Sequence, residues 1–104
     1  MRILVSGFEA FGGELENPTA DLVRALEGGQ IQIPEGVETL GVILPVTFGE
    51  AFRPLEKAIL IFKPDFVVAF GQAGGRSHVE IERIAVNLID AELPDNLGAQ
   101  PRDL

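Results

Sequence analysis

The chain has 104 residues, and its hydrophobic content of 46% is ordinary for a globular protein, so residues 1–104 are expected to form one domain. Sixteen acidic residues against eight basic ones give a net charge of -8, which argues against a nucleic-acid partner. No apolar run is long enough to span a bilayer, and the apolar start is too short for a signal peptide, so we expect no membrane partner. The absence of cysteine fits a reducing compartment and favours the cytoplasm.

The first part of the chain alternates between strand and helix patterns. Ile3 to Val5 form a short apolar run that is typical of a buried strand. Asn17-Pro18 supplies a helix cap followed by proline at the first helical position, and Gly28-Gly29 ends that helix. Val37 to Leu44 then predicts a second strand.

The clearest helical pattern follows this strand. Apolar residues recur there at intervals of three, four and seven and predict one buried face: Phe48, Phe52, Leu55, Ile59 and Phe62. Thr47 to Glu50 is a possible capping box, Pro54 predicts either a kink or a later helix start, and Lys63-Pro64 ends the pattern. The sequence "DFVVAF" from Asp65 to Phe70 then predicts a third buried strand.

This order of elements predicts the α/β class, with a mostly parallel, twisted sheet that carries helices on its faces. Two helices cannot cover both faces of a sheet of four or more strands. The sheet is therefore expected to be incomplete, and either a partner subunit or a longer protein would complete it.

A further strand or hairpin arm is expected from His78 to Ile89. Its apolar residues change phase at Glu82-Arg83, which predicts either a bulge or a strand buried on both faces. A carboxylate in such a segment needs a partner, water from a cleft, or a chemical role, and Arg76 or Arg83 could neutralise Glu82.

Two glycine-rich loops are expected at the same edge of the sheet, Ser6 to Gly13 after the first strand and Gly71 to Arg76 after the third. Neither has a phosphate-loop pattern. Phe8 and Phe11 are either core residues or the walls of a small apolar pocket. The second loop is either an ordinary turn or a set of backbone N–H groups that can hold a carbonyl oxygen.

The single histidine, His78, is expected at the surface. Neighbours on a strand point to opposite faces, so Ser77 and His78 are not expected to form a nucleophile pair. With one histidine, no cysteine and no calcium-loop pattern, we expect neither a metal nor a cofactor.

Three stretches resemble the pyrrolidone-carboxylate peptidase (pyroglutamyl-peptidase I) family: "SGFEAFGGELENPT", "LPVTFGEA" and "GQAGGRSHVEIERIAVNLIDAELPDNLGAQP". The resemblance covers nearly the whole chain, and "ERIAVN" and "PDNLG" are its specific parts. It implies an α/β/α sandwich in a cytoplasmic homo-oligomer. It also implies a cysteine peptidase that removes an N-terminal pyroglutamyl residue from peptides with a Glu, Cys and His triad.

The same resemblance implies roles for five residues. Glu82 matches the catalytic glutamate that orients and charges the histidine. Phe8 and Phe11 match the aromatic walls around the lactam ring, and Gln72 lies in the loop that binds the amide of the ring through its backbone. Asn17 matches an asparagine near the pocket.

The chain departs from the family pattern in three ways. The cysteine and the histidine of the triad lie in a later part of the family's chain, and His78 does not match that histidine. Glu80 stands where a serine or threonine is usual, and Glu92 stands where an arginine is usual. Two functions therefore remain: a cysteine peptidase represented by its amino-terminal portion, or a truncated, non-catalytic binding or assembly module. In either case the 104 residues alone are expected to be inactive.

Overall fold

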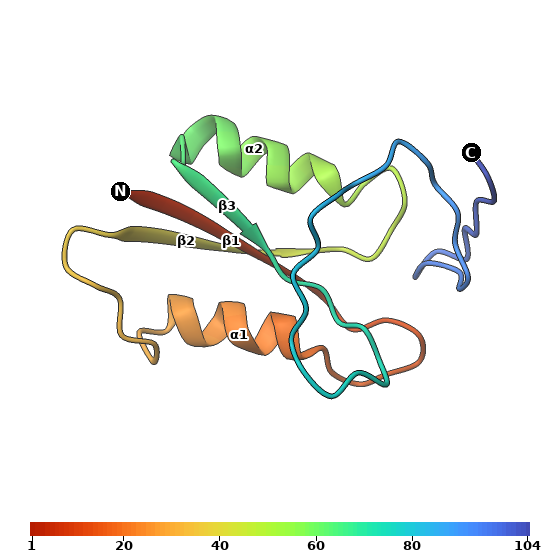
Figure 1. Ribbon diagram of the computed structural model, residues 1–104, viewed down its shortest axis with the longest axis horizontal. Helices are drawn as coiled ribbons and strands as arrows, with labels where there is room; N and C mark the ends of the chain where they lie inside the picture. The colour runs from red at the N-terminus through yellow and green to blue at the C-terminus, as the bar shows by residue number, and fades with distance from the viewer.

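The computed structural model describes all residues from Met1 to Leu104. Three strands and two helices alternate along the first two thirds of the chain (Figure 1). In chain order they are β1 (Arg2–Phe8), α1 (Pro18–Glu27), β2 (Glu38–Leu44), α2 (Phe52–Phe62) and β3 (Phe66–Ala69). Neither helix is long and apolar enough to cross a membrane.

The three strands form one parallel sheet in the order β2-β1-β3, so β1 is the central strand. Leu4, which is fully buried, lies opposite Leu40 of β2 and Val67 of β3. Helix α1 connects β1 to β2 on one side of the central strand, and α2 connects β2 to β3 on its other side. Since these two connections run in opposite directions, right-handed crossovers place the helices on opposite faces, as Figure 1 shows. The predicted α/β class is confirmed.

Helix α1 forms as its sequence predicts. The side chain of Asn17 accepts the N–H of Thr19 at 2.9 Å, and Pro18 occupies the first turn, where it needs no N–H partner. Val23, 2% exposed, packs toward β2, where a Cβ at Gly41 would lie 2.8 Å from its Cγ1. The close approach of α1 to β2 therefore depends on a glycine in the strand.

Helix α2 begins at Phe52, so Pro54 falls in its first turn, where it breaks no helical hydrogen bond. Of the two predicted alternatives, the later helix start is confirmed and the kink is not needed. The predicted capping box is wrong, because the cap residue is Ala51, whose side chain makes no capping hydrogen bond. Thr47 accepts the N–H groups of Glu50 and Ala51 on its carbonyl oxygen, and its own hydroxyl has no partner. These contacts form a turn before the helix rather than its cap.

The predicted buried face of α2 is only partly buried. No residue of the helix is fully buried, and Phe52 is 59% exposed. The helix packs on β2 and β1 and does not reach β3. All four residues of β3 are consequently exposed, so the predicted third strand forms but the prediction that it is buried is wrong for this chain. The exposure fits a sheet with too few helices to cover it.

The strand expected from His78 to Ile89 does not form, so both predicted explanations of its phase change, a bulge and a doubly buried strand, are wrong for this chain. The segment is irregular, and Val79, Ile81 and Ile84 are more than 80% exposed. A strand needs the backbone groups of a neighbour, and no segment of the chain pairs with residues 78–88.

The last sixteen residues form a closed loop. Ile89 and Leu104 exchange two backbone hydrogen bonds, of 3.0 and 2.9 Å, and Ala91 donates to Pro101 at 2.8 Å. Arg102 closes the loop further, because its Nη1 donates to the carbonyl oxygen of Ala91 at 2.9 Å. We call residues 89–104 the terminal loop; Figure 1 shows it as the blue segment beyond the carboxyl ends of the strands.

Candidate functional site at the carboxyl edge of the sheet

The connections that follow β1 and β3 begin side by side. The N–H of Phe70 donates to the carbonyl oxygen of Ser6 at 2.9 Å, so the two strands end at the same edge of the sheet. The chain leaves β1 toward α1 on one face, and α2 lies on the other face. In open parallel sheets such a reversal of strand order opens a crevice where ligands bind.

A broad, open hollow of about 980 Å³ lies beside this point. It is lined by the start of α1, by β3 and by the loop after β3, and it includes both Gln72 and Glu82. Its size is at the upper end of the range for small-molecule sites. Two of the five residues expected at the site are therefore brought together by the fold.

Glu82 is 83% exposed, so the expectation of a carboxylate within a buried strand is wrong for this chain. Arg76 Nη1 lies 3.9 Å from Glu82 Oε1 but only 2.5 Å from Glu80 Oε2. Arg83 makes no ion pair, so of the two expected partners only Arg76 is near. Glu80, one of the departures from the family pattern, therefore competes with Glu82 for the arginine.

Asn17 is 2% exposed, and its side chain is occupied by the protein itself. Its Oδ1 accepts the hydroxyl of Thr19 at 2.7 Å as well as the N–H of that residue, and its Nδ2 donates to the carbonyl oxygen of Glu9 at 3.1 Å. In this chain Asn17 caps α1 and ties it to the loop after β1. It does not line the hollow, although Pro18 and Thr19 beside it do.

Phe8 and Phe11 lie at the same edge but outside the hollow's lining. Phe8 is the last residue of β1 and donates its N–H to Thr19 Oγ1 at 2.8 Å, so the loop expected from Ser6 begins three residues later, at Glu9. Both phenylalanines are half-buried, which suits either a core residue or a pocket wall.

The reason for excluding a nucleophile pair of Ser77 and His78, that neighbours on a strand point to opposite faces, is wrong for this chain. No strand forms there, and Ser77 Oγ lies 2.9 Å from His78 Nδ1. His78 is exposed, as expected, and no carboxylate bonds to its ring. An activated serine needs a histidine that a third group orients, so this contact lacks part of a nucleophilic triad.

The sequence indicated the "PDNLG" segment only as a family motif. In the structure its residues Asp95 and Asn96 bond to the loops that follow β1 and β2 and to the turn of residues 95–99. The carboxylate of Asp95 accepts N–H groups from Phe48 at 2.7 Å, Leu97 at 2.9 Å and Ala99 at 2.8 Å. The hydrogen bond from Phe48, followed by those from Ala99, Leu97 and Gly98, lowers the pKa of Asp95 below its ordinary 3.8, against partial desolvation, which raises it.

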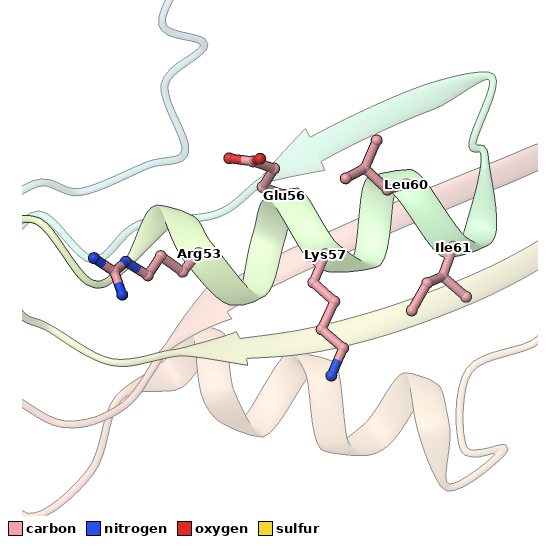
Figure 2. Close-up of a pocket in the computed structure, with 5 residues that line it drawn as sticks. All are labelled: Arg53, Glu56, Lys57, Leu60 and Ile61. Atoms are coloured by element: carbon pink, nitrogen blue, oxygen red, sulfur yellow. The ribbon is translucent and has the colours of Figure 1, made fainter.

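A second, smaller hollow of about 300 Å³ lies on the outer face of α2 (Figure 2). Its lining residues all come from one helix: Arg53, Glu56, Lys57, Leu60 and Ile61. It lies away from the carboxyl edge, and no cluster of residues in the chain could hold a metal ion. We therefore assign the candidate site to the hollow at the switch point.

The structure is an open α/β fold with a broad hollow, the candidate site, beside the central and third strands at the carboxyl edge of its sheet. The sequence model of the pyroglutamyl peptidase family matches residues 1–104, so the chain belongs to that family. It is 48% identical to the pyrrolidone-carboxylate peptidase of Pyrococcus furiosus over 103 residues, 99% of this chain and 48% of the relative, and 46% identical to that of Yersinia pestis over 102 residues, 98% and 46% respectively.

The same relation holds between structures. The crystal structure of the pyrrolidone carboxyl peptidase from Pyrococcus furiosus matches with a TM-score of 0.92 at 48% identity, covering 100% of this chain and 49% of that one. The chain thus spans about half the length of the relatives that it matches.

Proposed function

We propose that this chain carries the substrate-recognising part of a pyroglutamyl-peptidase site and takes part in removing an N-terminal pyroglutamyl residue from peptides. The observation that supports this most is the hollow at the switch point, which holds Gln72 and Glu82 together in a chain that belongs to the family. The absence of cysteine and the acidic charge favour a cytoplasmic protein that acts on peptides rather than on nucleic acid.

In this proposal each residue has a distinct task. Phe8 and Phe11 hold the faces of the five-membered lactam, and backbone N–H groups near Gln72 bind its amide oxygen. Asn17 acts indirectly, since its side chain already holds the start of α1 and the carbonyl oxygen of Glu9. Glu82 orients a histidine, and that histidine deprotonates a cysteine thiol that attacks the amide carbonyl.

The cysteine and the histidine must come from outside these 104 residues, because the chain has no cysteine and its one histidine bonds to Ser77. The proposal therefore concerns a protein that includes the remaining half of the family's chain. The first test compares the 104-residue chain with a form extended by the carboxyl-terminal half of the Pyrococcus furiosus relative, using a chromogenic pyroglutamyl amide. We expect turnover only in the extended form; an inactive extended form that is folded would contradict the proposal.

Glu82→Ala in the extended form should lower kcat strongly and KM little, because an orienting carboxylate acts on the histidine in the transition state. Removal of such a group costs on the order of 10⁴-fold in kcat in serine peptidases. Glu35→Ala is the matched control, since Glu35 is an exposed carboxylate without an ion pair. Full activity of Glu82→Ala would contradict a catalytic role for Glu82 and leave it only as an ion-pair partner of Arg76.

The absence of a cysteine also favours a second function, that of a non-catalytic binding or assembly module. The exposed strand β3 would then be the surface that binds another protein or a second copy. Loss of turnover in the extended form, combined with a stable complex at the edge of β3, would favour this function over the first. Phe66→Lys, which places a charge on the exposed strand at a residue outside the lining of the hollow, tests the complex without altering the candidate site.

A further inference from the structure

The loop after β1 is held from two sides at the two residues that separate Phe8 from Phe11. On one side Asn17 Nδ2 donates to the carbonyl oxygen of Glu9 at 3.1 Å. On the other side Asn96 Nδ2 donates to the carbonyl oxygen of Ala10 at 2.9 Å and lies 3.4 Å from Glu9 Oε1. Asn96 comes from the terminal loop, 86 residues away in sequence from Ala10.

Asn96 also touches the neighbouring connection. Its backbone N–H donates to the carbonyl oxygen of Val46 at 2.9 Å, and the N–H of Val46 points back to Glu9 Oε1 at 3.4 Å. One residue thus connects the loop after β1, the loop after β2 and the terminal loop. Figure 1 shows all three at the carboxyl end of the sheet.

Asp95 places Asn96 for these contacts. Its carboxylate shapes the turn of residues 95–99 through the N–H groups of Leu97 and Ala99, and it docks that turn on the N–H of Phe48. Gly98 has a φ of 86°, a left-handed conformation that suits glycine at this turn. Asp95 therefore sets the backbone position of Asn96, and the exposed Asn96 side chain is held by its contacts with Glu9 and Ala10.

We infer that Asn96 is a positioning residue for substrate: by holding Glu9 and Ala10, it fixes the segment that joins Phe8 to Phe11, and so sets the spacing of the two rings that receive the lactam. The inference rests on the proposed function, because it takes the two phenylalanines as pocket walls. Beyond Ala10 the loop has only one internal backbone hydrogen bond, from the N–H of Glu14 to the carbonyl oxygen of Phe11 at 3.1 Å. The loop therefore depends on the contacts of Asn96 for its shape.

Two variants separate the hydrogen bond from the shape of the side chain. Asn96→Ala removes the side chain, whereas Asn96→Asp keeps its shape, removes the N–H donor and places a negative charge next to Glu9. Asn87→Ala is the matched control, because Asn87 is an exposed asparagine in the segment before the terminal loop and its side chain makes no hydrogen bond. A role in packing alone would affect only the alanine variant.

The first measurement is hydrogen–deuterium exchange of the Glu9 and Glu14 amides in the 104-residue chain, since these two donate backbone hydrogen bonds within residues 9–16. It does not depend on activity. The loss of one hydrogen bond corresponds to about a fivefold faster opening. We expect that increase in Asn96→Ala, at least as much in Asn96→Asp because of repulsion from Glu9, and none in Asn87→Ala. Unchanged exchange in both Asn96 variants would overturn the inference, whatever the activity of the extended form.

The second measurement is the KM for a pyroglutamyl amide in the extended form. A loosened pocket wall should raise KM about tenfold while kcat falls less, since Asn96 does not touch the reacting bond. Normal KM in both variants of an active extended form overturns the inference and leaves the proposed function intact. If the unsubstituted extended form shows no turnover, the proposed function fails, and the role of Asn96 in substrate binding fails with it.

Discussion

The approach of β1 to α1 allows a quantitative prediction for Gly7→Ala. A Cβ at Gly7 would lie 2.4 Å from the carbonyl oxygen of Thr19 and 2.7 Å from its carbonyl carbon. Ordinary contacts between such atoms begin near 3.5 Å, so the first turn of α1 would have to move by about 1 Å. The atoms in the way belong to the backbone of a helix and cannot rotate aside.

That movement would disturb contacts beyond the clash itself. Thr19 Oγ1 accepts the N–H of Phe8 at 2.8 Å and donates to Asn17 Oδ1 at 2.7 Å. Overpacking costs about 1–3 kcal/mol, and loss of one hydrogen bond adds about 1 kcal/mol. We therefore expect the free energy of unfolding to fall by about 2–4 kcal/mol, which lowers Tm by at least about 8 °C in a protein of this size.

Gly71→Ala is the control for this substitution. Gly71 follows β3 at the same edge of the sheet, and a Cβ there would meet no heavy atom within 4 Å. Thermal unfolding followed by far-ultraviolet circular dichroism at low protein concentration compares the two variants. Equal Tm values for Gly7→Ala and Gly71→Ala would refute the packing of α1 against β1 described above.

Two further predictions concern the surfaces of the chain. Since Phe66, Val67 and Val68 of β3 are each more than 40% exposed, the isolated chain should self-associate, and Phe66→Lys should reduce this association; light scattering that shows a stable monomer at high concentration would contradict the prediction. The pKa of Asp95 is lowered on folding, so its stabilising effect is present above pH 3.8 and is lost as the pH falls through its folded value. Protection of the Phe48 amide, taken relative to the intrinsic exchange rate at each pH, should therefore fall on acidification below pH 3.8. It should fall less in Asp95→Asn, whose side chain does not titrate.

Elements with local signals were predictable. The cap and the proline at Asn17-Pro18 define the start of α1, and the apolar runs of β1, β2 and β3 were each located to within a few residues. The start of α2 was less certain, because Thr47 and Glu50 match a capping box but their backbone makes a turn instead. Hydrogen bonds between distant segments, such as that from Asn96 to Ala10, have no local signal at all.

The site was predictable only where it depends on strand order. Once β1 and β3 are neighbours in a parallel sheet, the loops that follow them must lie at one edge, and Gln72 joins Glu82 in the hollow there. The contact between Ser77 and His78 was missed for the opposite reason. Its exclusion assumed strand geometry in a segment that has no strand to pair with.

That segment explains why a charge can stand among apolar residues at Glu82. Val79 and Ile81 are as exposed as Glu82 itself, so residues 78–88 hold apolar surface that the chain does not bury. Burial of each such side chain is worth about 1.5–3 kcal/mol, but ordering each residue costs about 1–2 kcal/mol of backbone entropy. Burial of the side chains alone therefore gives little net free energy. Ordering of residues 78–88 becomes favourable only when a neighbouring strand also hydrogen-bonds to their backbone N–H and C=O groups. We expect Glu82 to reach a fixed position only when such a neighbour orders this segment. The proposed orientation of a histidine by Glu82 would then depend on the pairing of residues 78–88 with another strand.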